Sequence, residues 1–313
     1  MRAANDRFIS ICVCTYHRQL QLKRLLESLA AQQLEPGWQV ELIVVDNDVN
    51  KSASAVVEAQ RVQASPMMSV QYAVEPVQGI SYARNHAVAL ARGGWIAFLD
   101  DDEYVVEHWL KDMLTTLDAS TAAAVLGPVV PEFPRGSRSW AIKSGLFDRP
   151  QFASGTVVNS NECRLGNVLF CGQWLQRYLP NPFDIRLAHS GGEDTDYFMR
   201  AARDGATFVW CHAAIAYEEV PLSRQSVAWL LGRRFQAASM YWRLQSVTLP
   251  ASRRWGLAML GVAGAALYGV VALILLPLGR DRSVRSLVKS ASALGRIAML
   301  CRFNIIVYRP RTQ

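Results

Sequence analysis

Cysteine is scarce in this chain: there are six in 313 residues, and none belongs to a C-x-x-C pair. That is too few for a disulfide scaffold. The chain also lacks a secretory signal, because residues 1–7 are polar and an apolar, strand-like run follows directly. Together these absences predict a reduced protein that is not secreted and whose body faces the cytosol.

Glycine-rich phosphate-binding motifs are missing as well, since neither G-x-G-x-x-G nor G-x-x-x-x-G-K-[ST] occurs. A Rossmann dinucleotide site and a P-loop are therefore not supported. Only 19% of the residues are charged whereas 51% are apolar, so the chain can bury a full core and is not disordered. Its length suits one large α/β domain or two medium ones.

Acidic residues are nearly absent from the C-terminal part of the chain. Residues 221–313 hold 14 lysines and arginines but a single acid, Asp281, whereas residues 1–220 hold 19 basic and 25 acidic residues. A basic region of this kind is typical of a chain that binds nucleic acid or an anionic membrane surface. Because the acidic body would repel a phosphate backbone, no nucleic-acid partner is expected.

A membrane is favoured by 25 consecutive uncharged residues, 255–279, which are long enough to cross a hydrocarbon core. The alternative is a buried helical hairpin. Basic residues flank the run on both sides, so a single span would leave one positive flank outside, against the positive-inside tendency. Glycines and Pro277 would allow a re-entrant hairpin or a kinked helix, and residues 284–308 have the spacing of an interfacial helix. We expect an attachment with both ends cytoplasmic.

The acidic part alternates strand-like and helix-like runs. Strands are predicted at residues 8–13, 40–45, 69–73, 95–99 and 207–211. Helices are predicted at residues 20–30, 80–91, 194–203 and 224–243. Continuous apolar strands that alternate with helices predict a parallel α/β sheet covered on both faces, in which ligands bind at the carboxyl ends of the strands.

The sharpest chemical signal is an acidic cluster, Asp100 to Glu103, directly after the strand at 95–99. Four adjacent acids repel one another unless a cation or strong donors offset them. Mg²⁺ typically uses one or two such carboxylates together with substrate phosphates. The plainer alternative is a solvated acidic loop that caps the next helix.

Three other polar segments should meet the acids at the same sheet edge. They follow the first strand, the second strand and Gly79, and they are Thr15 to Arg18, Asp46-Asn47 and Arg84-Asn85. They would supply acceptors for a base and a ribose and a guanidinium for phosphate. Each segment alone also has a structural explanation, such as a helix cap or a surface ion pair, but the set is harder to explain that way.

In these segments the chain resembles the inverting family 2 glycosyltransferases of the GT-A fold. The resemblance is carried, in order, by ISICVCTYHR, LIVVDND, GISYARN, GWIAFLDDDE, RLGNVLF and SGGEDTDYFMRAARDG. It covers roughly residues 8–245. Within the family the chain looks most like bacterial exopolysaccharide glucosyltransferases of the succinoglycan type.

The resemblance implies a role for each matching residue. Thr15 and Asp46 would contact the uracil or ribose of a UDP-sugar. The expected nucleotide-sugar site consists of Thr15, Tyr16, Arg18, Asp46, Asn47, Gly79, Arg84, Asn85, Asp100 and Asp101. Asp100 and Asp102 would form the D-x-D motif that holds Mg²⁺ or Mn²⁺, with Asp102 the more direct ligand. Asp194 would be the general base, and Glu193 would support it or contact the acceptor.

Two features of many relatives are absent. A His is common near residues 216–221, where this chain reads AIAYEEVP from residue 214, and the Q-x-x-R-W signature of processive synthases is missing. The resemblance therefore implies addition of one sugar rather than polymerisation.

The expected activity is transfer from a UDP-hexose, such as UDP-glucose, to a polyprenyl-diphosphate-linked saccharide in exopolysaccharide or surface-polysaccharide synthesis. It would take place at the cytoplasmic face of a bacterial inner membrane. A sugar nucleotidyltransferase is one alternative, although it would need a glycine-rich loop after the first strand. A non-catalytic, nucleotide-binding membrane scaffold is the other.

The predicted division of the chain has a catalytic domain at 1–245 and a membrane-associated region at 246–313. The catalytic domain comprises a nucleotide-binding half at 1–104, an acceptor half at 105–223 and a basic interfacial helix at 224–245.

Overall fold

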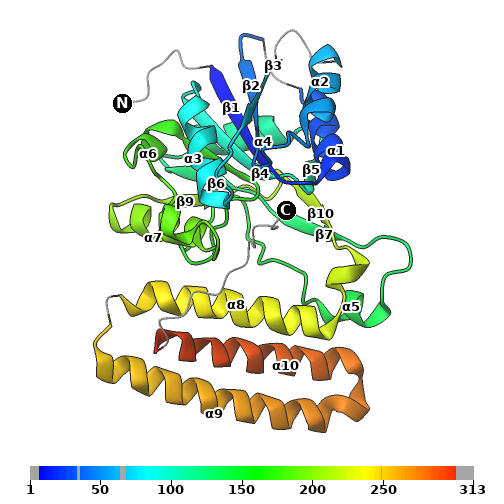
Figure 1. The fold of residues 1–313 in the computed structure, drawn as a ribbon, viewed down its shortest axis with the longest axis vertical. Helices are drawn as coiled ribbons and strands as arrows, with labels where there is room; N and C mark the ends of the chain where they lie inside the picture. The colour runs from blue at the N-terminus through cyan, green and yellow to red at the C-terminus, as the bar shows by residue number, and fades with distance from the viewer. Residues whose placement is uncertain (1–6, 34–35, 64–67, 248, 301–313) are drawn as a thin grey trace.

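The computed structural model describes residues 7–33, 36–63, 68–247 and 249–300. Within them the chain forms an α/β body and, at one end of it, a layer of three long helices (Figure 1). The α/β class expected from the sequence is confirmed.

The body is built on a seven-stranded sheet in the order β3-β2-β1-β4-β8-β6-β9. Its strands are β1 (Phe8–Thr15), β2 (Gln39–Asp46), β3 (Met68–Val74), β4 (Trp95–Asp100), β6 (Ala124–Leu126), β8 (Val168–Cys171) and β9 (Phe208–Trp210). β1 pairs in parallel with β2 and β4, and β2 pairs in parallel with β3, as the continuous apolar runs predict. All five predicted strands are present within two residues of their expected bounds.

The sheet is not parallel throughout, because β8 runs antiparallel to both β4 and β6. A parallel strand needs a crossover connection that packs on the sheet. The proline-interrupted segment before β8 forms only β7 (Val129–Glu132) and the short helix α5 (Ser139–Ser144), and α5 packs against the helix layer instead.

Helices cover both faces of the sheet. One face carries α1 (Gln19–Ala30), α2 (Ser54–Gln63) and α4 (Trp109–Asp118), and the other carries α3 (Ile80–Leu90), α6 (Gly172–Gln176) and α7 (Glu193–Arg203). Successive strand residues point to opposite faces, so Ile11 and Val13 enter the first core whereas Cys12 enters the second. The expected helices at 20–30, 80–91 and 194–203 are confirmed within one residue.

A second, three-stranded sheet was not predicted. Its order is β5-β10-β7, with β5 (Glu103–Val105) antiparallel to β10 (Ala216–Glu219) and β10 parallel to β7. The register sets Glu218 opposite Glu103. This small sheet therefore brings a distant glutamate to the acidic cluster.

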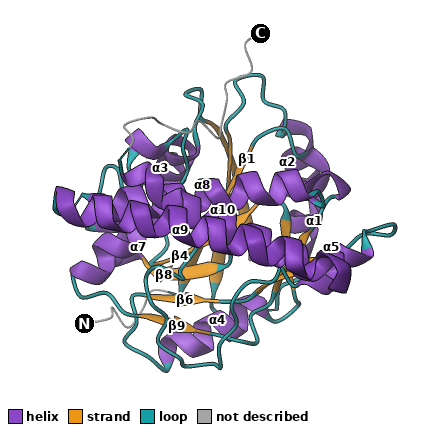
Figure 2. Cartoon of the chain, turned by 90° about the horizontal axis from the view of Figure 1, so that it is seen from below, coloured by secondary structure: helices purple, strands orange, loops and turns teal. Residues whose placement is uncertain are grey.

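The helix layer consists of α8 (Val227–Ser246), α9 (Ala251–Leu275) and α10 (Arg280–Leu294). A 3-10 turn, η3 (Leu276–Leu278), joins α9 to α10, and η4 (Gly295–Met299) follows α10. In Figure 1 α8 lies next to the body, α10 is in the middle and α9 is outermost; Figure 2 shows the same layer from below, crossing the body.

Two helix predictions need correction here. The helix expected at 224–243 begins only at Val227, because the Ser226 hydroxyl accepts the Trp229 N–H and caps the helix there, which leaves Arg224 in a preceding turn, η2 (Leu222–Arg224). The interfacial helix expected at 284–308 begins earlier, at Arg280, and α10 ends at Leu294. Residues 301–308 of that prediction lie outside the described residues.

Candidate functional site

The predicted site segments lie at the carboxyl ends of three adjacent strands. β1, β2 and β4 end at Thr15, Asp46 and Asp100. The register pairs Thr15 with Asp46 and Cys14 with Asp100, so the three ends are level. The expectation that these segments meet at one sheet edge is confirmed.

The first and last residues of the 15–18 segment are joined to the acidic cluster by short hydrogen bonds. The Thr15 hydroxyl donates to Asp101 Oδ2 over 2.8 Å, and Arg18 Nη1 donates to Asp101 Oδ1 over 2.7 Å. The same nitrogen reaches Asp102 Oδ2 at 2.9 Å. Asp101 is buried, and that burial raises its carboxyl pKa to about 6 against the opposing charge of Arg18. Thr15 and Arg18 thus hold the acidic cluster in place.

Asp102 is also contacted from the C-terminal part of the chain. Arg224 Nη2 donates to Asp102 Oδ2 over 3.2 Å, while Arg224 Nη1 donates to Glu218 Oε1 over 2.7 Å. Arg149 donates to the second oxygen of Glu218. Burial and the neighbouring Glu218 charge raise the pKa of Asp102. Arg149, Glu218 and Arg224 were not predicted as site residues.

Glu103 and the Gly166-Asn167 pair pack against Asp100 of the acidic cluster. Glu103 is buried and accepts the Asp100 N–H over 3.0 Å. A Cβ on Gly166 would lie 2.5 Å from Glu103 Oε1 and 3.0 Å from Asp100 Oδ2, so only glycine permits this approach. Asn167 has a φ of 62° and its amide donates to two carbonyls, those of Pro128 and Ala214, over 2.8 Å each. The Gly166-Asn167 pair therefore fixes the backbone next to the acidic cluster.

Arg84 connects the acidic cluster to the Glu-Asp pair at the start of α7. It is buried on α3, and it donates to Glu193 through Nη1 and to Asp100 Oδ1 through Nη2, the latter over 3.1 Å. Glu193 is only 3% exposed, and burial raises its pKa to about 7 despite the opposing effect of Arg84. Two predicted groups 109 residues apart in sequence are thus in direct contact.

Asp194 differs from its neighbour in being half-buried at the first turn of α7. Its Oδ1 accepts the Thr195 N–H over 2.7 Å, which fixes the carboxylate and leaves Oδ2 without a bond to the described residues. Gly192, with a φ of 89°, precedes the helix, and a Cβ there would lie 2.3 Å from Met240 Cγ on α8. The pair of acids is therefore mounted where the body meets the helix layer.

The side chains of several predicted nucleotide-binding residues form hydrogen bonds with the protein's own backbone. Asp46 is fully buried and accepts the N–H groups of Asp48 and Ala53, over 3.1 and 2.8 Å. Asn47 accepts the Gly79 N–H over 2.7 Å. These contacts position the loops after β2 and before α3.

Asn85 and Tyr16 have different surroundings. The Asn85 side chain exchanges hydrogen bonds with the Phe183 backbone, donating to its carbonyl over 2.8 Å and accepting from its N–H over 2.9 Å. The Tyr16 ring packs edge-on against His17. Asn85 thus holds the segment that leads to α7, whereas the Tyr16 side chain is half-buried and contacts only its neighbour His17 among the ring contacts of the described residues.

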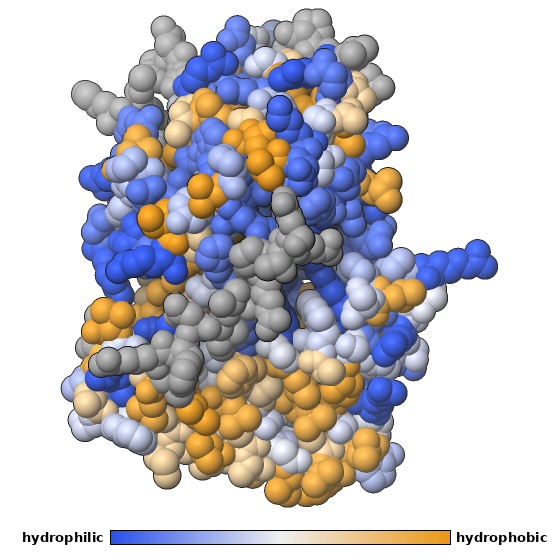
Figure 3. Space-filling view, viewed as in Figure 1, coloured by the Kyte–Doolittle hydropathy of each residue, from blue (hydrophilic) through white to orange (hydrophobic). Residues whose placement is uncertain are grey.

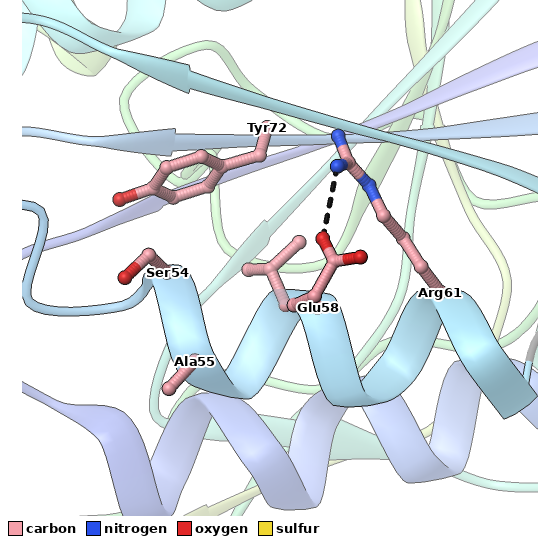
Figure 4. A pocket seen from close by; sticks show the side chains of 6 residues that line it. Ser54, Ala55, Glu58, Arg61 and Tyr72 are labelled. Atoms are coloured by element: carbon pink, nitrogen blue, oxygen red, sulfur yellow. Dashed lines mark hydrogen bonds and ion pairs between the residues drawn. The ribbon is translucent and has the colours of Figure 1, made fainter.

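A hollow of about 310 Å³ lies between α2 and β3 (Figure 4). It is lined by Ser54, Ala55, Val57, Glu58, Arg61 and Tyr72. None of these is a predicted site residue, but the Tyr72 hydroxyl donates to Asp46 Oδ2 over 2.8 Å. This hollow adjoins the site through Asp46 rather than forming its centre.

The acidic cluster fits a divalent ion only in part. Among the described residues no group of three or more His, Cys, Asp or Glu side chains is arranged to hold a metal. Asp100, whose side chain is 41% exposed, and Asp102 carry carboxylate oxygens of the kind that such an ion would bind. Mg²⁺ and similar ions are often bound by one or two carboxylates plus substrate phosphates, so this donor set fits an ion that arrives with a diphosphate.

Comparison with known proteins identifies the family. The model of glycosyl transferase family 2 matches residues 10–169. The chain belongs to this glycosyltransferase family. It is 38% identical over 262 residues to the succinoglycan biosynthesis protein ExoM of Rhizobium meliloti, which covers 81% of this chain and 80% of that protein.

Solved structures agree on the fold. TarS 1-349 of S. aureus in complex with UDP aligns with 93% of this chain and 90% of its own at a TM-score of 0.54 and 19% identity. The mannosyltransferase PcManGT of Pyrobaculum calidifontis, in complex with GDP-Man and Mn²⁺, aligns with 93% and 86% at a TM-score of 0.63 and 17% identity. The expected GT-A architecture of this glycosyltransferase is thereby confirmed.

Proposed function

We propose that this family 2 glycosyltransferase moves one sugar, with inversion, from a UDP-hexose to a polyprenyl-diphosphate-linked saccharide in bacterial exopolysaccharide synthesis. The observation that carries the proposal is Arg84, which bonds at once to Glu193 of the Glu-Asp pair and to Asp100 of the D-x-D motif. This contact supports a single centre in which donor and acceptor groups face each other. The resemblance to a succinoglycan biosynthesis protein supports the polysaccharide context.

The donor would bind along the ends of β1, β2 and β4. Thr15, Arg18 and the loop that Asp46 and Asn47 shape would take the nucleoside, as the family motifs imply. Asp100 and Asp102 would hold Mg²⁺ or Mn²⁺, and such an ion offsets the charge that develops on a departing diphosphate. A neighbour that carries UDP and another that carries Mn²⁺ support this choice of ligands.

Asp194 is the proposed general base. The acceptor hydroxyl oxygen attacks the anomeric carbon while the bond from that carbon to the diphosphate oxygen breaks, and the hydroxyl proton passes to the Asp194 carboxylate. Its Oδ2, which has no described partner, is available for that proton. One displacement inverts the anomeric centre, so an α-linked donor yields a β-glycoside.

Glu193 has a positioning role in this scheme. Its carboxylate is buried against Arg84 and is too enclosed to receive a substrate proton. It fixes the Arg84 guanidinium, which in turn lies beside Asp100. The two acids of the pair thus differ in task because they differ in exposure.

We further propose that residues 1–245 carry catalysis and that residues 246–313 attach the enzyme to the cytoplasmic face of the inner membrane. The apolar helix supports this proposal by its length and composition. Attachment would bring the enzyme to an acceptor whose lipid part stays in the membrane.

The deciding experiment offers purified enzyme a panel of UDP- and GDP-sugars with Mg²⁺ or Mn²⁺. Thermal protection identifies the donor, and release of free UDP measures turnover. Protection by one UDP-hexose together with UDP release supports the proposal. Protection without any UDP release indicates a non-catalytic scaffold, and formation of UDP-sugar from UTP and a sugar phosphate indicates a nucleotidyltransferase.

A further inference from the structure

A broad apolar face lies on the outermost helix. Of the described residues, Ala251–Leu278 is the one helical segment long and apolar enough to cross a membrane. Only 17% of its most apolar stretch of 18 residues is buried. Six large side chains of α9 are each at least 60% exposed: Trp255, Met259, Leu260, Leu267, Leu273 and Ile274. Figure 3 shows hydrophobic residues gathered over this end of the molecule. A buried hairpin would not leave this surface open.

The opposite face of α9 is closed by α10. Its buried positions are small residues, Ala258, Gly261, Ala265 and Ala272, which recur at helical spacing. A Cβ on Gly261 would lie 2.6 Å from the Ala293 carbonyl oxygen, so the two helices touch backbone to backbone. α9 thus has one packed side and one bare side.

Serine hydroxyls fasten the two helices along their length. Ser283, Ser286 and Ser290 of α10 each donate over 2.8 Å to a carbonyl of α9, those of Ala272, Tyr268 and Ala265. Close small-residue packing with serine-to-backbone bonds is typical of helix pairs in membranes. α9 therefore does not separate from α10 without losing bonds at three successive turns.

α10 also carries basic side chains that limit how the α9–α10 pair can be oriented in a membrane. Arg282, Arg285 and Lys289 are exposed and fall on one stripe of α10. If α9 crossed a bilayer with α10 attached, these three cations would enter hydrocarbon, where charged side chains are expensive. If α9 lies flat, the cations stay at the level of the lipid headgroups, as in interfacial helices.

We propose that α9 lies in the plane of the membrane and inserts its apolar face into one leaflet of a bilayer rich in anionic phospholipid. The inference rests on the proposed function for its membrane setting and adds the mode of attachment. The charge balance of the chain supports the choice of an anionic bilayer, since the region from residue 221 has a single acid. Basic side chains beside a buried apolar face attract anionic headgroups.

The same orientation turns the catalytic centre toward the membrane surface. Met240 of α8 meets Gly192 next to the Glu-Asp pair, and Arg224, which lies over the Trp229 ring of α8 at 5.8 Å, contacts Asp102. Both catalytic motifs therefore abut the layer whose outer face holds α9. An acceptor that extends from the headgroup region approaches the centre from that side.

The first test measures sedimentation of the full-length chain with phosphatidylcholine vesicles, with and without phosphatidylglycerol. The variant Leu260→Lys/Leu267→Lys charges the exposed face of α9 and should lower the bound-to-free ratio at least tenfold. Leu20→Lys is the matched control, because Leu20 is 82% exposed on α1 of the body, and it should bind as the wild type does. Equal binding by the α9 variant, or no preference for phosphatidylglycerol, overturns the inference.

The second test separates a flat helix from a spanning one. Arg282→Cys, bound to vesicles from outside, is treated with a membrane-impermeant maleimide, and peptide mass mapping reports modification at that position. A flat α9 leaves position 282 outside and reactive in intact vesicles, as in the control Leu20→Cys. Modification only after the vesicles are lysed means that α9 spans, and pairing of two chains through α9 without vesicle binding means that the face is a dimer interface; either result overturns the inference.

UDP-sugar turnover is measured in parallel on every variant. An enzyme that turns over donor but ignores vesicles refutes the flat attachment and leaves the proposed function intact. An enzyme that binds vesicles in this way but has no turnover refutes the proposed function alone.

Discussion

Asp194→Asn should slow sugar transfer at least ~100-fold while leaving the fold and donor binding unchanged. The amide has nearly the shape of the carboxylate, and its oxygen still accepts the Thr195 N–H that Asp194 Oδ1 accepts over 2.7 Å. Asp194 is half-buried and has no salt bridge among the described contacts, and its charge attracts Arg84 but repels Glu193, so removing it has opposing effects. The folded state is therefore expected to stay within about 1 kcal/mol of the wild type.

The loss should appear in turnover because an amide does not take up the acceptor proton. Proton transfer by a positioned side chain is worth roughly 100- to 10,000-fold in rate. The smaller value corresponds to about 2.7 kcal/mol of transition-state stabilisation. Since the proposed donor site lies at the ends of β1, β2 and β4, UDP affinity should change less than about twofold, well below 1.4 kcal/mol.

The assay compares kcat for transfer with UDP affinity by calorimetry. The matched control is Asp196→Asn, two residues further along α7, where the carboxylate pairs with Arg200 over 2.8 Å. Loss of that helical pair costs about 0.3–0.5 kcal/mol and should not affect turnover. Transfer by Asp194→Asn within threefold of the wild type, or an equal loss in Asp196→Asn, would remove Asp194 from the role of base.

Four further predictions follow from particular contacts. Asp102→Ala should weaken UDP binding in Mn²⁺ by ~10–100-fold, measured by calorimetry, and unchanged affinity would make the acidic cluster a mere loop. Glu193→Gln should flatten the plot of Tm against pH between about pH 4.5 and 7. Burial raises the pKa of Glu193 to about 7 in the folded state, above the unfolded value of 4.5, so ionisation of Glu193 lowers the stability of the fold as the pH rises through that range. An unaltered slope in the variant contradicts this. Gly261→Val should destabilise the helix layer by ~1–3 kcal/mol in thermal unfolding because its Cβ meets the Ala293 carbonyl, whereas Gly256→Ala, which meets nothing, should not. Phe170→Ala should cost ~3–5 kcal/mol in denaturant unfolding, since the ring is fully buried and stacks on Phe198 at 5.7 Å; a cost below 1 kcal/mol would mean that this core is loosely packed.

The central strands and their polar ends could be predicted because local sequence determines both. β1, β2 and β4 are nearly continuous apolar runs, and strands of that kind lie in the centre of a parallel sheet that is covered on both faces. The acids and amides that follow each run mark where it ends, so Thr15, Asp46 and Asp100 are predicted to be neighbours without any long-range information. Their register bears this out.

The outer part of the site could not be predicted in the same way. Arg149 comes from an irregular segment, Glu218 from a four-residue strand and Arg224 from a single turn, and such short pieces have no measurable periodicity. Arg224 and Asp102 are 122 residues apart, and only the small sheet brings them together. The one available signal was the segment at 216–221, where the family resemblance led us to expect a histidine and the chain has none.

The apolar segment at 255–279 shows why length and composition alone leave several arrangements open. The 25 uncharged residues fit a span, a re-entrant hairpin or a flat helix equally well, because hydropathy measures how apolar a segment is and not which side of it is covered. In the structure α10 covers one face of α9. Its serines donate hydrogen bonds to the carbonyls of Ala265, Tyr268 and Ala272, and its basic side chains run along the length of the helix pair. A helix tied to a cationic neighbour along one face has only its other face to offer to lipid. That asymmetry is the reason for proposing attachment in the plane of the membrane, and with it the approach of the acceptor from the side of α8.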